Sequence, residues 1–216
     1  MLAYASRTGT QQNLAALRRA DWRLLVSAVG SLRTEGFPYA LDNGAWTAFC
    51  QGHPFDERRF LRALRRLGAQ ADWTVVPDIV AGGQASLELS LRWLRPVLDE
   101  CAQALLAVQD GLTPDDVGPL VGARVGLFVG GSTAWKESSL PLWGAVARQQ
   151  GCWLHVGRVN TARRIHLCSA AGATSFDGTS VSRFAKTLPL LDQARKQLNL
   201  FTGGARTADA AKETVG

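Results

Sequence analysis

Six short apolar runs in this sequence end in an acid, an amide or a pair of glycines, and a helical pattern follows each of them. Three runs end in an aspartate, namely Asp42, Asp78 and Asp177, and Asp110 lies just beyond another. Converging carboxylates suit work at a sugar carbon, where one attacks the anomeric centre and another moves a proton. The runs with their polar ends are 39–44, 75–78, 106–111, 127–132, 155–158 and 175–179.

Each aspartate also has a simpler interpretation, because loop aspartates commonly cap the helix that follows. Carboxylates can instead bind a metal ion, but the sequence has no His/Asp cluster at ligand spacing, and we expect no metal site. The glycine and histidine motifs of nucleotide hydrolases, dinucleotide-binding proteins and α/β-hydrolases do not occur. His155 and His166 are interpreted as packed or exposed rather than catalytic.

Other polar residues at the ends of these runs could bind a flat, polar ligand. Gly130 and Gly131 can bring backbone amides close to a ring, although they could equally form a tight turn. Gln109 can donate and accept hydrogen bonds, which suits the edge of a base or a buried structural amide. Five cations flank the last two runs and could contact phosphates or form a solvated helix face: Arg158, Arg163, Arg164, Arg183 and Lys186.

These residues need a scaffold that brings the ends of successive strands together. Apolar runs alternate with helical patterns along the chain, which at 216 residues favours one closed (β/α)8 TIM barrel over an open sheet. The segment 29–36 is too short for a full helix, so we expect one barrel helix to be missing. Strands are predicted at 2–5, 23–28, 38–41, 73–77, 104–108, 125–129, 153–156 and 174–177, and helices at 10–20, 56–67, 83–99, 113–120, 135–150, 160–171 and 182–198.

Composition is that of an ordinary soluble domain, with 46% hydrophobic and 19% charged residues. No apolar run is long enough to span a membrane and the N-terminus has no export signal, so we expect a cytoplasmic protein. We expect a single domain over 1–201 and a disordered tail over 202–216. The net charge of +6 favours a polyanionic partner such as nucleic acid.

At these residues the chain resembles the tRNA-guanine transglycosylase superfamily, and is most similar to its small phage and bacterial branch, the DpdA-type DNA 7-deazaguanine transglycosylases. The segment 41–46, Leu-Asp-Asn-Gly-Ala-Trp, is similar to the family's Asp-Ser-Gly-Gly-Phe segment, and 108–111 is similar to its Val-Gln-Gly segment. Gly130-Gly131 matches its glycine pair, and 175–177 matches its segment ending in Phe-Asp. The likeness covers residues 38–184 in the same order.

The resemblance implies a base exchange with two displacements and no cofactor. Asp177 would be the nucleophile at C1′ of a guanine nucleotide and Asp42 the proton shuttle. Asp78, Gln109, Asn43, Gly130 and Gly131 would bind the base, which enters as a free 7-deazaguanine such as preQ0. The family's zinc site and the insertion that carries it are absent from this sequence, which favours DNA over tRNA as the polymer.

Several alternatives stay open at the level of sequence. The chain could act on tRNA, could be a non-catalytic nucleic-acid-binding subunit of the same fold, or could be an unrelated barrel hydrolase that acts on a free nucleoside. Asn43 and Ala45 depart from the family's Ser and first Gly, which affects the expected base pocket. The sequence also leaves open whether helper proteins or a homodimer take part.

Overall fold

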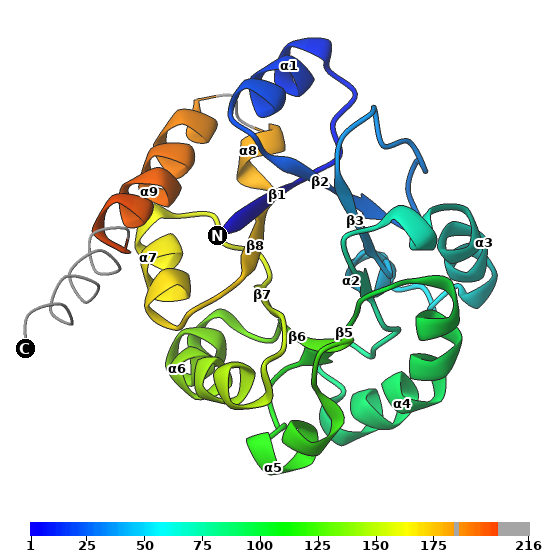
Figure 1. Ribbon diagram of the computed structural model, residues 1–216. Helices are drawn as coiled ribbons and strands as arrows, with labels where there is room; N and C mark the ends of the chain where they lie inside the picture. Colours follow the sequence, from blue (N-terminus) through cyan, green and yellow to red (C-terminus); the bar gives the residue numbers. More distant parts are fainter. Residues whose placement is uncertain (184–185, 203–216) are drawn as a thin grey trace, which may run out of the picture.

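The protein is a closed barrel of eight parallel strands surrounded by helices (Figure 1), as the alternating pattern predicted. The computed structural model describes residues 1–183 and 186–202. Strands pair in chain order, and β8 closes the barrel against β1. The strands are β1 Leu2–Ser6, β2 Arg23–Ser27, β3 Tyr39–Asp42, β4 Thr74–Val75, β5 Ala104–Val108, β6 Val125–Val129, β7 Leu154–Val156 and β8 Ser175–Gly178.

The helices largely follow the predicted ranges, with three differences. A short helix after β3 was not predicted, the helix expected at 113–120 is a single turn that continues as a 3-10 turn, and the last predicted helix is split in two. The helices are α1 Gln11–Arg19, α2 Ala45–Cys50, α3 Glu57–Leu67, α4 Gly83–Glu100, α5 Pro114–Val117, α6 Thr133–Gln150, α7 Ala162–Ala170, α8 Ser180–Arg183 and α9 Thr187–Thr202, with 3-10 turns at Gly68–Gln70 and Gly118–Leu120.

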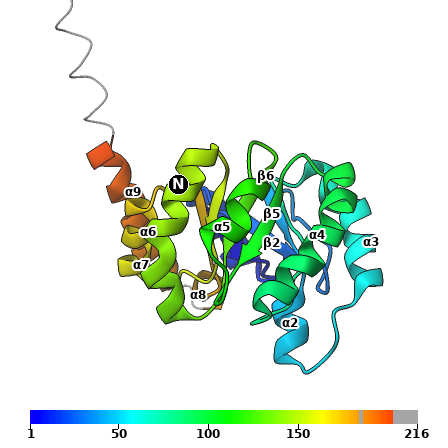
Figure 2. The ribbon, with the colours of Figure 1, turned by 90° about the horizontal axis from the view of Figure 1, so that it is seen from below.

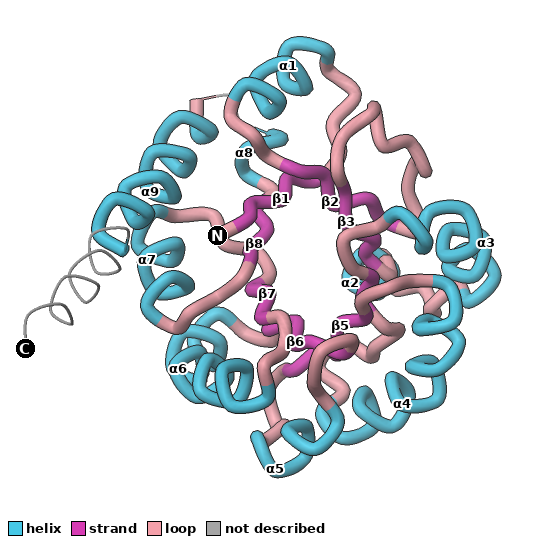
Figure 3. The backbone as a smooth tube through the Cα atoms, viewed as in Figure 1, coloured by secondary structure: helices cyan, strands magenta, loops and turns pink. Residues whose placement is uncertain are grey.

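The expected missing helix is confirmed between β2 and β3. Residues 28–38 cross from one strand to the next as turns and loop. Figure 3 shows that loop, and no helix, occupies the space between α1 and α3. The segment contains Gly30, Gly36 and Pro38, which disfavour a helix, and it lacks the apolar spacing of an amphipathic helix. One side of the barrel is therefore covered by loop alone.

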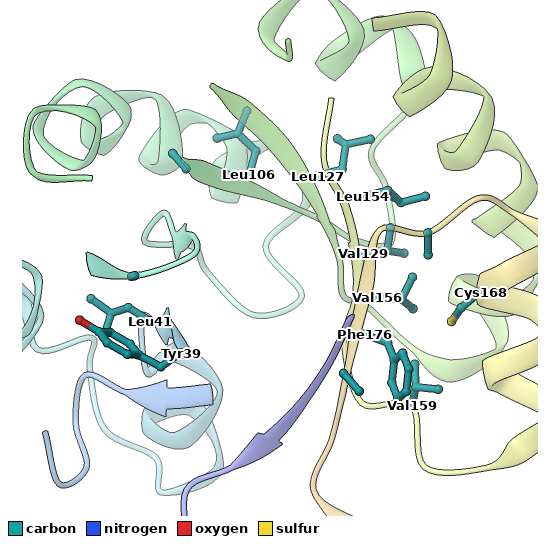
Figure 4. Packing of buried hydrophobic residues seen from close by; sticks show 14 of the residues in the cluster. Tyr39, Leu41, Leu106, Leu127, Val129, Leu154, Val156, Val159, Cys168 and Phe176 are labelled. Atoms are coloured by element: carbon teal, nitrogen blue, oxygen red, sulfur yellow. The ribbon is translucent and has the colours of Figure 1, made fainter. Parts of the chain in front are cut away.

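Side chains alternate between the barrel interior and the layer of helices, as parallel strands require. The interior cluster contains Tyr4, Ala40, Trp73, Val75 and Leu105. The other set packs between the strands and the helices, and Figure 4 shows part of it, including Leu127, Val129, Leu154, Val156 and Phe176. Because the interior is filled by bulky side chains, access to the strand ends is from the mouth of the barrel.

Three further expectations concern regions away from the barrel. Thr202, placed in the tail by the sequence, is the last residue of α9, and 203–216 lie outside the described residues. None of the described helices is long and apolar enough to cross a membrane. The described residues also contain no group of three or more His, Cys, Asp or Glu side chains that could hold a metal ion.

Candidate active site in the barrel mouth

A cavity of about 960 Å³ lies at the carboxyl ends of the strands, where α2 projects from the barrel (Figure 2). Its size is that of a typical small-molecule site. Eight of the predicted site residues line it, and they come from six different strand ends: Asp42, Asn43, Asp78, Gln109, Gly130, Gly131, Arg158 and Asp177. The prediction that the polar strand ends converge is therefore correct.

Asp177 lies at the end of β8 and is 3% exposed. One carboxylate oxygen, Oδ1, accepts a hydrogen bond from the backbone N–H of Arg158 at 3.2 Å and contacts His155 Nε2 at 3.1 Å. The other oxygen has no hydrogen bond to a described residue. This arrangement fixes the carboxylate and leaves Oδ2 available to a ligand in the cavity.

His155 connects Asp177 to a chain of buried polar groups. The indole N–H of Trp153 donates to Ser175 Oγ at 2.8 Å, and Ser175 Oγ lies 2.8 Å from His155 Nδ1. Because Ser175 Oγ accepts from Trp153, its own hydroxyl can donate a hydrogen bond to Nδ1. The ring N–H is then at Nε2, where it donates a hydrogen bond to Asp177. Burial lowers the pKa of His155 although the Asp177 carboxylate opposes this, so the imidazole is a neutral donor.

Aromatic rings hold this imidazole inside the barrel. His155 is fully buried, its ring stacks on Phe128 with centroids 4.9 Å apart, and the Trp73 ring is 4.4 Å away. The expectation that His155 is packed is correct, but it missed the contact with Asp177. His155 pairs with Ser175 across β7 and β8, so the parallel register places Asp177 beside it, a relation that no single strand reveals.

Asp42 extends from the end of β3 and has a strongly perturbed pKa. Asp42 is half-buried in the cavity wall, and desolvation there, with the nearby charges of Asp177 and Asp78, raises the pKa of its carboxyl to about 7. The Gly44 amide, which donates to Oδ2 at 3.1 Å, and the Ser27 hydroxyl partly oppose this rise. A carboxyl with a pKa near neutrality can both give and accept a proton, which is what acid/base work requires.

Asn43 and Asp78 form a pair beneath this part of the cavity. The Asn43 side-chain amide donates to Asp78 Oδ1 at 2.7 Å and to the Val76 carbonyl at 2.8 Å, and its oxygen accepts from the Ala45 amide at 2.8 Å. Asn43 is therefore committed to protein partners and orients Asp78. Burial raises the pKa of Asp78 to about 6, against the hydrogen bond from Asn43.

Gln109 is a buried structural amide, the alternative that the sequence left open beside base recognition. Its Nε2 donates to the Ile79 carbonyl and its Oε1 accepts from the Ala81 amide, both at 2.7 Å. Ala81 has a left-handed backbone with φ of 58°, which alanine rarely adopts, so this loop is strained and needs support. The side chain at the end of β5 thus fixes the loop after β4, which carries Asp78.

The glycine pair lies against the cavity as predicted, and the neighbouring aspartate has a structural role. Gly131 has φ of +73°, and a Cβ there would lie 2.5 Å from Asp110 Oδ2, so glycine is required. Asp110 accepts from the amide of Ser132 at 2.7 Å and from its hydroxyl at 2.8 Å, just before α6. It therefore holds the loop of the glycine pair.

Among the predicted cations, Arg158 lies in the cavity wall beside Asp177. Its guanidinium donates to the Gly131 carbonyl at 2.5 Å and lies 4.2 Å above the centre of the Trp46 ring. Its backbone is left-handed, with φ of 59°, a strained conformation that often occurs at functional sites. Arg158 thus connects the loops after β6 and β7 to α2.

The other predicted phosphate-binding cations do not line the cavity. Arg163 and Arg164 both pair with Glu137 of α6, at 2.6 and 2.8 Å, so one of their two positive charges is balanced there. Lys186 is exposed away from the cavity wall, and the side chain of Arg183 lies outside the described part. The cavity wall thus contains Arg158 but not Arg163, Arg164 or Lys186, and the contact of these three with phosphates stays a prediction.

Comparisons with known proteins support the fold and leave the activity open. No family model and no curated protein matches the chain. RipC from Yersinia pestis is similar with a TM-score of 0.52, covering 88% of this chain and 94% of that one. The native KDPGal structure gives 0.55 over 93% and 97%, and a designed cube-shaped, highly porous protein cage gives 0.58 over 95% and 76%. All three share 12% identity with the chain, so they show the fold alone.

Proposed function

We propose that the protein is a DNA-guanine transglycosylase that exchanges guanine in DNA for a free 7-deazaguanine base. The observation that carries the proposal is the pair of carboxylates in one cavity: Asp177, held through Oδ1, and Asp42, with its pKa near 7. A nucleophile and a proton shuttle are the two groups that a base exchange needs. The ordered resemblance described above supplies the substrate class.

In the proposed first step, Asp177 Oδ2 attacks C1′ of a guanine nucleotide, and the bond between C1′ and N9 breaks. Protonated Asp42 gives its proton to the leaving guanine, and the sugar is held on Asp177 as an ester. The incoming 7-deazaguanine then loses its N9 proton to Asp42, attacks C1′ and releases Asp177. Protons and bonds balance over the cycle, and the phosphate backbone stays intact.

Each remaining residue of the site has a place in this scheme. Asp78 and the amides near Gly130 and Gly131 contact the base, whereas Asn43 and Gln109 position Asp78 and its loop. Because the cavity is enclosed by strand ends, the target nucleotide must be extruded from a duplex or already single-stranded. In the proposed reaction the polymer is DNA, and no cofactor takes part.

The test is incorporation of labelled guanine or preQ0 into DNA and, in parallel, into tRNA. We expect label in DNA, and a denaturation-resistant protein–DNA adduct when no incoming base is supplied. Both should be lost in Asp177→Ala and retained in Asp115→Ala, an exposed aspartate of α5 that serves as the matched control. Label mainly in tRNA would reassign the polymer, and an undiminished adduct in Asp177→Ala would contradict the nucleophile.

A further inference from the structure

The outer face of α3 carries a dense group of positive charge. Asp56 caps the helix by accepting from the Arg59 amide at 3.0 Å, and Phe60, Ala63, Leu64 and Leu67 turn into the core. All the arginines of the helix are exposed, and we call them the α3 arginine face: Arg58, Arg59, Arg62, Arg65 and Arg66.

Most of this charge has no carboxylate partner among the described residues. Arg59 pairs with Asp56 at 3.3 Å, an exposed pair that contributes little. For the other four arginines, no carboxylate of the described residues lies within ion-pair distance, in contrast to Arg7, which pairs with Glu35. Like charges three and four residues apart on one helix repel, so the arrangement costs stability unless an anion binds there.

The α3 arginine face begins at the rim of the proposed active site. Gly30 lines the large cavity and also a shallow hollow whose other wall contains Arg59 and Arg62. Gln51 likewise lines the cavity and a second hollow that Arg59 borders. This continuity exists because 28–38 is a loop, and Figure 1 shows α3 directly beside it.

We propose that the α3 arginine face binds the sugar-phosphate backbone of the DNA strand next to the nucleotide that enters the cavity. From Arg58 to Arg66 the helix rises about 12 Å, which corresponds to roughly three to four nucleotide steps of about 3.4 Å. Arginine binds phosphate oxygens through paired N–H groups. This inference rests on the proposed function for the choice of polymer.

A membrane surface fits this face less well than a nucleic acid does. Helices that bind membranes insert large apolar side chains beside their cations. On α3 the large apolar residues Phe60, Leu64 and Leu67 are buried against the barrel, and Leu61 is half-buried. The face therefore offers charge without an apolar surface to insert.

The test compares two double variants that each remove two exposed arginines from one helix. The first is Arg62→Gln with Arg66→Gln on α3, and the control is Arg92→Gln with Arg95→Gln on α4. Binding of a labelled single-stranded oligodeoxynucleotide that contains guanine is measured between 50 and 200 mM salt. Each lost phosphate contact should reduce the slope of log K against log salt by about 0.7, so the α3 variant should lose about 1.4.

The expected result is weaker, less salt-dependent binding for the α3 variant and unchanged binding for the α4 control. Equal behaviour of the two variants would overturn the inference, as would a loss confined to tRNA. Binding requires no catalysis, so the two proposals can fail separately. An α3 effect without base incorporation by the wild-type protein would contradict the transglycosylase proposal alone. Incorporation with an unchanged KM for DNA in the α3 variant would contradict the binding surface alone.

Discussion

Two buried groups of the site, Asp42 and His155, have protonation states that the surrounding residues set in opposite ways. Asp42 is protonated below about pH 7 because burial and two other carboxylates disfavour its charge. His155 is neutral because burial disfavours its charge, and its Nε2 N–H donates a hydrogen bond to Asp177. The site thus holds one carboxyl ready to give a proton and a second carboxyl held in place by hydrogen bonds from the protein.

The raised pKa of Asp42 predicts a pH-dependent gain in stability for Asp42→Asn. In the unfolded chain this aspartate ionises near pH 4, whereas in the folded protein it ionises near 7. The unfolded state therefore binds fewer protons between these values, and wild-type stability falls as pH rises through this window. In thermal melts, the Tm of Asp42→Asn relative to that of the wild type should increase from pH 4 to pH 8. The exchange activity of the variant should be lost. A difference in Tm that is constant with pH would contradict this.

His155 is expected to act as a positioning residue for Asp177. In His155→Phe the carboxylate loses a donor worth about 1–3 kcal/mol, so adduct formation should slow by about 10- to 100-fold. His155→Gln, which can still donate, should restore part of the rate. Single-turnover adduct formation distinguishes this role from a general loss of folding, because DNA affinity should stay the same in both variants. Equal rates of adduct formation in His155→Phe and His155→Gln would contradict the positioning role of His155.

At the scale of elements, the loop between β4 and α4 depends on a side chain from the next strand. Gln109 of β5 supplies the partners of Ile79 and Ala81, and Ala81 is held in a left-handed conformation. Gln109→Leu should leave two backbone groups unpaired and cost about 1–3 kcal/mol. Because this loop carries Asp78, KM for the free base should rise more than KM for DNA. Equal increases in the two KM values would contradict this role for Gln109.

The sequence predicted the convergence of the strand ends but not which side chains would face the cavity. Alternating apolar and helical patterns suffice for a barrel, and a barrel places Asp42, Asp78 and Asp177 on one face. The contacts of Asn43, Gln109 and Asp110 depend on neighbouring loops, which local spacing does not encode. The pairing of Arg163 and Arg164 with Glu137 was likewise not predicted, because Glu137 belongs to the preceding helix, α6.

At the scale of the whole molecule, the barrel combines a rigid interior with one thin side. Aromatic residues and His155 fill the interior beneath Asp177, so the nucleophile rests on packed rings. Between β2 and β3 a loop replaces the helix, and the α3 arginine face adjoins it. The two proposals therefore place chemistry in the barrel mouth and polymer binding on its flank.

The loop at 28–38 has a topological consequence for the polymer. A strand that follows the proposed path, over the rim at Gly30 and along α3, lies on the outside of the barrel. Such a strand is laid on sideways rather than threaded, so a free 5′ or 3′ terminus is unnecessary. A covalently closed single-stranded circle should accept as much label per guanine as the same circle cut once. A circle that is labelled only after cutting would mean that the strand enters end first.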